Sequence, residues 1–134
     1  MFVEKNDYIQ IGGSLKQVIA LDGTVRDVIT GHQQQYILTS CHILITNDVL
    51  IACGFVKNAD NVYCEILQDD YKSCSISTEH LPMEKEYLIT LTDNSGMQTF
   101  KKSIIVLSEL QDWVREKTGF ELKIDELKLA DAIN

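Results

Sequence analysis

The chain has 134 residues, of which 45% are hydrophobic and 24% are charged, and its formal net charge is −8. These totals are typical of one globular domain, so residues 1–134 are predicted to form a single domain. They disfavour two classes of partner: no basic block is present to bind a phosphate backbone, and no apolar run approaches the roughly 20 residues of a membrane-spanning helix.

Four short strands with close turns are predicted at the start of the chain. Apolar side chains alternate there in four segments, residues 8–11, 15–21, 24–30 and 35–39. The clearest turn between them is Asp22-Gly23, because both residues tolerate a positive φ. Parallel strands would need longer connections, so the segment is predicted to be an antiparallel meander or a small barrel.

A short helix is predicted over residues 47–53. Thr46 fits an N-cap, because its hydroxyl can accept a hydrogen bond from an unpaired N–H of the first turn. Gly54 fits the left-handed position after the last turn, and Phe55 fits the apolar contact that follows such a glycine.

Two hairpins are predicted next. Segments 61–67 and 71–77 alternate and are joined by a three-residue loop. In that register Cys64 lies opposite Cys74, although a disulfide is not expected in a reducing compartment. Segment 86–92 alternates most clearly and is followed by a turn and a short return strand. We expect its edge to be open to a partner.

The longest helical pattern covers residues 101–120. Its apolar face recurs at spacings of three and four and consists of Leu107, Leu110, Trp113 and Val114. Ser108 and Gln111 fit a capping box at its start, with Ser103 as a rival start, and Gly119 fits a left-handed stop. We expect this helix to pack across the sheet with Trp113 in the core.

The last part of the chain is predicted to hold a brief strand around Leu122 and Ile124, and then a helix capped by Asp125. The whole pattern predicts an α+β fold. It combines a strand-rich antiparallel N-terminal meander or small barrel, the short helix 47–53, further hairpins and one long C-terminal helix packed on the sheet.

Three pieces of the chain resemble, in order, a family of small proteins from prophages and mobile elements of gut Bacteroidetes. They are DYIQIGG at residues 7–13, ITNDVLIACGFVK at residues 45–57 and LSELQDWVREKTGFEL at residues 107–122. The resemblance depends on the order of these pieces and on the spacing of the motifs LxxCGF and LQxW…TGxEL. The resemblance implies one small domain and a phage-like genomic setting, and it implies no named activity.

The cysteines and histidines are the first residues to consider for catalysis or metal binding. The cysteines are each at least ten residues apart, at Cys41, Cys53, Cys64 and Cys74. Structural zinc draws thiolates in close pairs such as CxxC, so we interpret these cysteines as small buried side chains and predict no metal and no cofactor. A Cys–His hydrolase needs a thiol beside a positioned base, and His32, His42 and His80 lie in no such motif.

Our first functional hypothesis is a non-enzymatic accessory or interaction protein of a prophage or mobile element, which acts through protein contacts or self-association. Its expected interaction surface is the exposed side of residues 107–118, formed by Glu109, Asp112 and Glu116, together with the edge of 86–92. The first residues carry charges where a signal peptide is apolar, so the cytoplasm is the expected location.

Two alternatives stay open. One is a small-barrel module that binds nucleic acid through a local patch, formed by Lys16, Arg26, Lys101 and Lys102. The other, which has the least support, is the Cys–His hydrolase.

Overall fold

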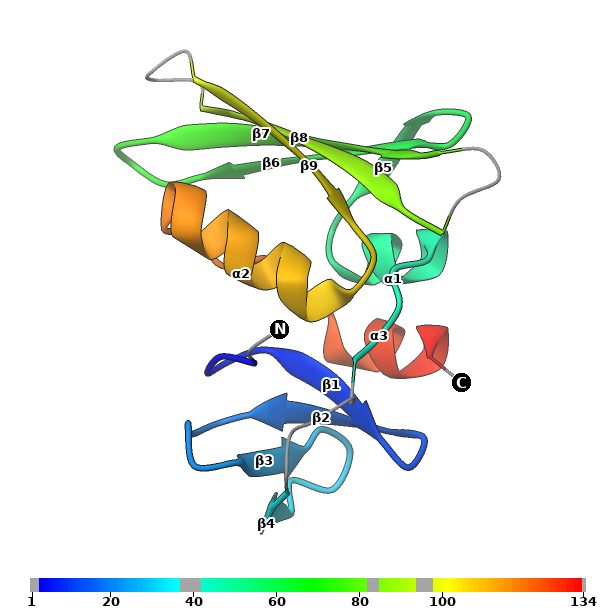
Figure 1. The fold of residues 1–134 in the computed structure, drawn as a ribbon, viewed down its shortest axis with the longest axis vertical. Coiled ribbons are helices and arrows are strands. Elements are labelled where there is room, and N and C mark those ends of the chain that lie inside the picture. The colour runs from blue at the N-terminus through cyan, green and yellow to red at the C-terminus, as the bar shows by residue number, and fades with distance from the viewer. Residues whose placement is uncertain (1–2, 37–41, 82–84, 94–97, 134) are drawn as a thin grey trace.

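The computed structural model describes residues 3–36, 42–81, 85–93 and 98–133. Two antiparallel sheets face one another across a layer of helices (Figure 1). The main hydrophobic core joins side chains from both sheets and all three helices. The α+β class predicted from the sequence is therefore confirmed. No described helix is both long and apolar enough to span a membrane. Residues 94–96 of the turn predicted after segment 86–92, and residues 37–39 of the fourth predicted strand, lie outside the described residues.

The N-terminal sheet is a meander whose strands follow one another in space. Its strands are β1 (Tyr8–Ile11), β2 (Ser14–Val18), β3 (Thr24–Asp27) and β4 (Gln33–Gln35). Strand β3 ends earlier than predicted, because the Asp27 carboxylate accepts hydrogen bonds from the N–H groups of Ile29 and Thr30. Of the two predicted alternatives, the described strands form the open meander.

The short helix α1 (Asn47–Ala52) begins and ends as the sequence predicts. The Thr46 hydroxyl accepts a hydrogen bond from the N–H of Val49 at 3.1 Å. Gly54 has φ 93°, and the N–H of Phe55 donates to the carbonyl of Leu50 at 3.1 Å. This pattern is a Schellman end, in which a left-handed glycine lets the chain satisfy its last carbonyls.

The second sheet has five strands in sequence order. They are β5 (Val56–Ala59), β6 (Val62–Gln68), β7 (Ser73–His80), β8 (Tyr87–Asp93) and β9 (Thr99–Ile104). Strand β5 was not predicted from the sequence, and its residues are all exposed. As predicted, β8 buries alternate residues on one face, namely Tyr87, Ile89 and Leu91.

The predicted register of the first hairpin in this sheet is wrong. Leu67 pairs with Cys74, and Cys64 pairs with Ser77. The turn is longer than expected, because the Asp69 carboxylate accepts hydrogen bonds from two backbone N–H groups of the turn, both at 2.8 Å. Cys64 and Cys74 therefore point to opposite faces of the sheet, and no disulfide can join them.

The predicted long helix is in fact a strand followed by a helix. Residues 99–104 form β9, and α2 (Leu107–Thr118) begins only where the helical apolar period starts. Ile104 pairs with Tyr87, so β9 covers the side of β8 that we expected to be open. Strand β8 is internal, and β9 is the edge of the sheet.

Helix α2 buries its predicted apolar face against the five-stranded sheet and stops at Gly119, which has φ 76°. The predicted capping box is wrong. Ser108 lies inside the first turn, 3.2 Å from Nδ1 of His42, and makes no cap. The start is held instead by the backbone, since the N–H of Leu107 donates to the carbonyl of Ile43 at 2.8 Å.

Helix α3 (Glu126–Ala132) is capped by Asp125 as predicted, with the N–H of Lys128 as donor at 3.1 Å. The brief strand expected before it is absent, because residues 120–125 have no regular structure. The N–H of Asp125 donates to the carbonyl of Ala52 at 2.8 Å, which ties the start of α3 to the end of α1.

Candidate functional site

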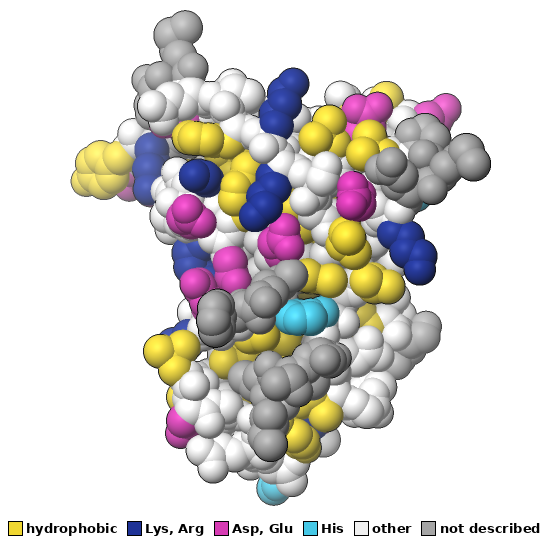
Figure 2. Space-filling model, viewed as in Figure 1, with side chains coloured by type: hydrophobic (Ala, Val, Ile, Leu, Met, Phe, Trp, Pro, Cys, Tyr) yellow, Lys and Arg dark blue, Asp and Glu magenta, His cyan; other side chains and the backbone are white. Residues whose placement is uncertain are grey.

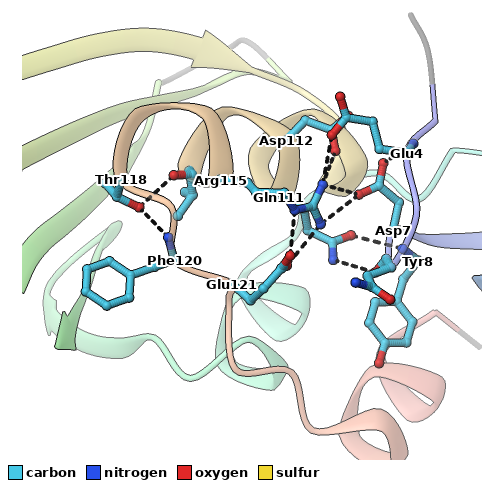
Figure 3. Close-up of polar contacts among 11 residues, drawn as sticks. Glu4, Asp7, Tyr8, Gln111, Asp112, Arg115, Thr118, Phe120 and Glu121 are labelled. Carbon is cyan, nitrogen blue, oxygen red and sulfur yellow. Dashed lines mark hydrogen bonds and ion pairs between the residues drawn. The ribbon is translucent and has the colours of Figure 1, made fainter. Parts of the chain in front are cut away.

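The densest polar contacts lie where α2 meets the segment leading into β1 (Figure 3). The guanidinium of Arg115 contacts four carboxylates, and we call this set the Arg115 cluster: Glu4, Asp7, Asp112, Arg115 and Glu121. Asp112 lies one helical turn before Arg115, so both side chains share a face of α2. Glu121 reaches the same guanidinium because the chain reverses at Gly119.

Four contacts define the geometry of this cluster. Nη1 of Arg115 lies 2.9 Å from Asp112, 3.0 Å from Glu4 and 3.3 Å from Asp7, and Nε lies 2.6 Å from Glu121. The N–H of Glu4 also donates to Asp7 at 2.8 Å. One guanidinium thus joins the N-terminal segment, α2 and the loop after α2.

The electrostatics of the cluster favour a protonated carboxyl group. Asp7 has no exposed surface, and burial, together with a hydrogen bond that the protonated Asp7 carboxyl donates to Asp112, raises the pKa of Asp7 to about 8. Burial also raises the pKa of Asp112. Hydrogen bonding to Glu121 raises the pKa of Arg115, which stays charged. Burial and the neighbouring Asp112 therefore favour the protonated form of Asp7.

Gln111 fixes the position of β1 beside this cluster. Its side chain is buried, accepts a hydrogen bond from the N–H of Tyr8 at 3.0 Å and donates to the carbonyl of Asn6 at 3.2 Å. The Tyr8 hydroxyl in turn donates to Glu126 of α3 at 2.7 Å. Carboxyl pairs that share a proton can act as acids or bases, but a substrate cannot reach the buried carboxyl of Asp7 in this conformation. The Arg115 cluster therefore has a structural role, in which it holds the segment before β1 against α2.

The three residues of the interaction surface expected on α2 differ in their exposure. Only Glu116 is freely exposed, with 70% of its side chain accessible. Glu109 is partly covered and lies 3.6 Å from Nζ of Lys102. Asp112 was expected on the exposed side, and this expectation is corrected: the N-terminal segment packs beside α2, and Asp112 turns into the Arg115 cluster.

The basic residues proposed for nucleic acid are not gathered in one patch. On the N-terminal sheet, Lys16 pairs with Asp27 at 2.7 Å, and Arg26 pairs with Glu126. Lys101 and Lys102 belong to β9, on the other sheet.

Two further lysines lie near the end of α2: Nζ of Lys72 donates to the carbonyl of Thr118 at 2.5 Å, and Lys117 belongs to α2 itself, whose neighbour β9 carries Lys101 and Lys102. Figure 2 shows dark-blue side chains over this part of the surface, interleaved with acidic ones. Nζ of Lys117 lies 5.0 Å from the centre of the Phe100 ring, and Nζ of Lys72 lies 4.8 Å from that of Phe120. Sequence reasoning missed these contacts because only tertiary packing brings Lys72 to the end of α2 and Lys117 to Phe100 of β9.

A hollow with a volume of about 440 Å³ lies beside the start of α1. Its wall includes His80, whose ring stacks on Tyr87 with 4.7 Å between the ring centres. The Tyr87 hydroxyl donates to Asn47 at 2.8 Å, and the Thr46 hydroxyl caps the helix. These polar groups are occupied within the protein, so they do not converge on a ligand.

Two of the described cysteines, Cys53 and Cys74, lie in surroundings that disfavour a thiolate. Cys53 is buried and Cys74 nearly so, and burial raises the pKa of both thiols. His42 contacts Ser108 rather than one of these thiols. Cys41 lies outside the described residues, and among those described no three His, Cys, Asp or Glu side chains are placed to hold a metal.

Glu65 is a second perturbed acid that the sequence did not reveal. It occupies the inward row of β6 between Tyr63 and Leu67, and its Oε2 atom is buried without a hydrogen-bond partner. Burial raises the pKa of Glu65 to about 7. Its Oε1 atom lies so near Gly54 that a Cβ there would be 2.6 Å away.

In comparisons with known proteins, no family model, no curated protein and no solved structure matches the chain. The function is therefore inferred from the surfaces of the protein itself.

Proposed function

We propose that this protein is a non-enzymatic accessory protein of a prophage or mobile element, and that it acts through protein contacts or self-association. The observation that carries the proposal is the outer face of the five-stranded sheet. The described helices all lie on the opposite face of this sheet, toward the N-terminal sheet (Figure 1). An antiparallel sheet tolerates one wet face, and such a face is also a ready surface for another protein.

Apolar side chains are concentrated at one side of this outer face. Val56 on β5 is 69% exposed and Ile66 on β6 is 64% exposed. Val56 pairs with Cys64, which lies two residues before Ile66 on the same face, so the three form a strip. Tyr71, in the turn after β6, is also exposed. Scattered apolar residues are ordinary on a surface, whereas a strip with a nearby aromatic side chain resembles the centre of a protein interface.

The charge distribution favours a protein over a nucleic acid as partner. Lys16 and Arg26 are each held by a carboxylate, so they are not free to replace counterions on a phosphate backbone. The phage-like setting is supported by the sequence resemblance of residues 7–13, 45–57 and 107–122, and a cytoplasmic location is proposed with it.

The proposal is tested by measuring association with and without the apolar strip. Light scattering over a range of concentrations measures self-association, and affinity purification of the tagged protein from its native cells, with cross-linking, recovers a partner. We expect Ile66→Lys to weaken whichever association is found. Leu21→Lys is the matched control, because Leu21 is 83% exposed but belongs to the N-terminal half. A strict monomer that recovers no cross-linked partner refutes the proposal.

A further inference from the structure

Strand β9 is the longer and more regular edge of the five-stranded sheet. Among the described strands it pairs with β8 alone, so half of its backbone N–H and C=O groups point away from the sheet. The opposite edge, β5, has four residues, and its register shifts between Lys57 and Ala59. β9 has six residues in unbroken register from Thr99 to Ile104. A bulged edge resists an added strand, whereas a regular one accepts it.

Positive charge surrounds this edge in a protein whose net charge is −8. Lys101 is exposed on the outer face, opposite Thr90, and makes no ion pair with a described acidic residue. Lys102 faces the other side of the sheet, where it lies 3.6 Å from Glu109. Lys117 approaches the same side from α2, over the Phe100 ring. Both faces of an added strand would therefore meet a lysine.

From this geometry we propose that β9 binds an extended acidic segment of a partner protein as a sixth strand of the sheet. The outward N–H and C=O groups of β9 pair with the backbone of the segment. Acidic side chains of the segment that point to the outer face pair with Lys101, and those on the other face compete with Glu109 for Lys102. This inference rests on the proposed function, because it names the chemistry of the partner.

The same lysines disfavour the other occupants. Edge-to-edge pairing of two copies of β9 would bring like charges together, which destabilises cross-strand pairs. A lysine on an edge protects a sheet against uncharged and basic strands, but it does not repel an acidic one. A nucleic acid would also meet Glu109 and Glu116 within this surface, whereas a peptide can place its charges selectively.

The inference is tested with two synthetic fluorescent peptides, one with alternating valine and glutamate and the other with lysine in place of glutamate. Binding is followed by anisotropy and by the amide NMR spectrum of the full chain. We expect only the acidic peptide to bind, with shifts and slowed hydrogen exchange along β9. Lys101→Glu should weaken binding about tenfold, since an attractive pair becomes a repulsive one. Lys57→Glu is the matched control on the β5 edge and should have no effect.

Lys101→Ala serves as a second variant, expected to weaken binding by a smaller factor. The inference is overturned if both peptides bind equally, if neither binds, if the shifts map to β5, or if single-stranded DNA displaces the acidic peptide and binds more tightly. These failures differ from failure of the proposed function. A Lys101→Glu protein that recovers the same cross-linked partner in undiminished yield refutes the acidic strand and leaves the function standing, whereas a wild-type monomer without a partner refutes the function itself.

Discussion

Asp7→Asn changes the one ionisable group that is wholly buried in the Arg115 cluster. The amide has the shape of the protonated carboxyl group: its oxygen can still accept from the N–H of Glu4, and its NH₂ can still donate to Asp112. The substitution therefore imitates the protonated acid at every pH, and the two proteins should differ only where wild-type folding requires Asp7 to take up a proton.

The size and sign of the effect follow from the pKa of Asp7. It is raised from 3.8 to about 8 by burial, so between these values the folded protein holds a proton that the unfolded chain has released. The stability contributed by the protonated group is fully present below pH 3.8 and is lost as pH rises toward about 8. The slope is about 1.4 kcal/mol per pH unit for one proton, and the full range sums to about 6 kcal/mol. Asp7→Asn should therefore match wild type near pH 4 and become progressively more stable than wild type up to about pH 8.

The assay is urea unfolding at several pH values, followed by Trp113 fluorescence. Glu116→Gln, on the exposed side of the same helix, is the control and should unfold in parallel with wild type at each pH. Two results would refute the reasoning. If the Asp7→Asn and wild-type stabilities stay parallel, Asp7 does not take up a proton on folding. If Asp7→Asn is less stable throughout, the carboxylate is ionised and its pairing with Arg115 stabilises the fold.

Three further outcomes are expected. Gln111→Leu leaves the backbone N–H of Tyr8 in β1 buried without its acceptor and should lower the free energy of unfolding in urea by about 1–3 kcal/mol. Hydrogen exchange should become faster, at first only in β1, and unchanged exchange there would contradict the contact. Gly54→Ala should destabilise more than Gly31→Ala, because both have positive φ but only the first places a Cβ against another side chain, and equal losses of thermal stability would exclude that clash. Cys64 should react with iodoacetamide well before Cys53, because Cys53 is fully buried and its pKa is raised; mass spectrometry that finds the reverse order would contradict the burial of Cys53 at the end of α1.

Local chemistry explains the elements that the sequence predicts well. Both helix ends at glycine are set by a left-handed residue without a Cβ, and the start of α1 is set by one threonine hydroxyl. Neither feature depends on a distant partner. The N-terminal meander is also set locally, because its short turns bring consecutive strands side by side and so determine which strands pair.

Long-range contacts explain the errors. Residues 101–104 continue the helical pattern in the sequence, but pairing with β8 makes them part of a strand, and the helix begins only at Leu107. Asp112 was predicted to lie on the solvent-exposed face of the helix, because the helical period cannot show that residues 4–7 pack beside it. The Arg115 cluster joins positions more than a hundred residues apart, and no local spacing marks such a set. The turn at Asp69 is a local error, in which one side chain lengthened the loop beyond the expected count.

The contact of Gln111 with Asn6 and Tyr8 has a consequence for the order of events during synthesis. The first sheet leaves the ribosome early, yet the side chain that receives β1 is made about a hundred residues later. Until then Tyr8 and Leu15 have no helix to cover them, and closing so long a loop is slow. The nascent chain should therefore expose apolar side chains of its first sheet for several seconds. In this period a chaperone that binds exposed apolar surface would have the greatest effect on the yield of folded protein.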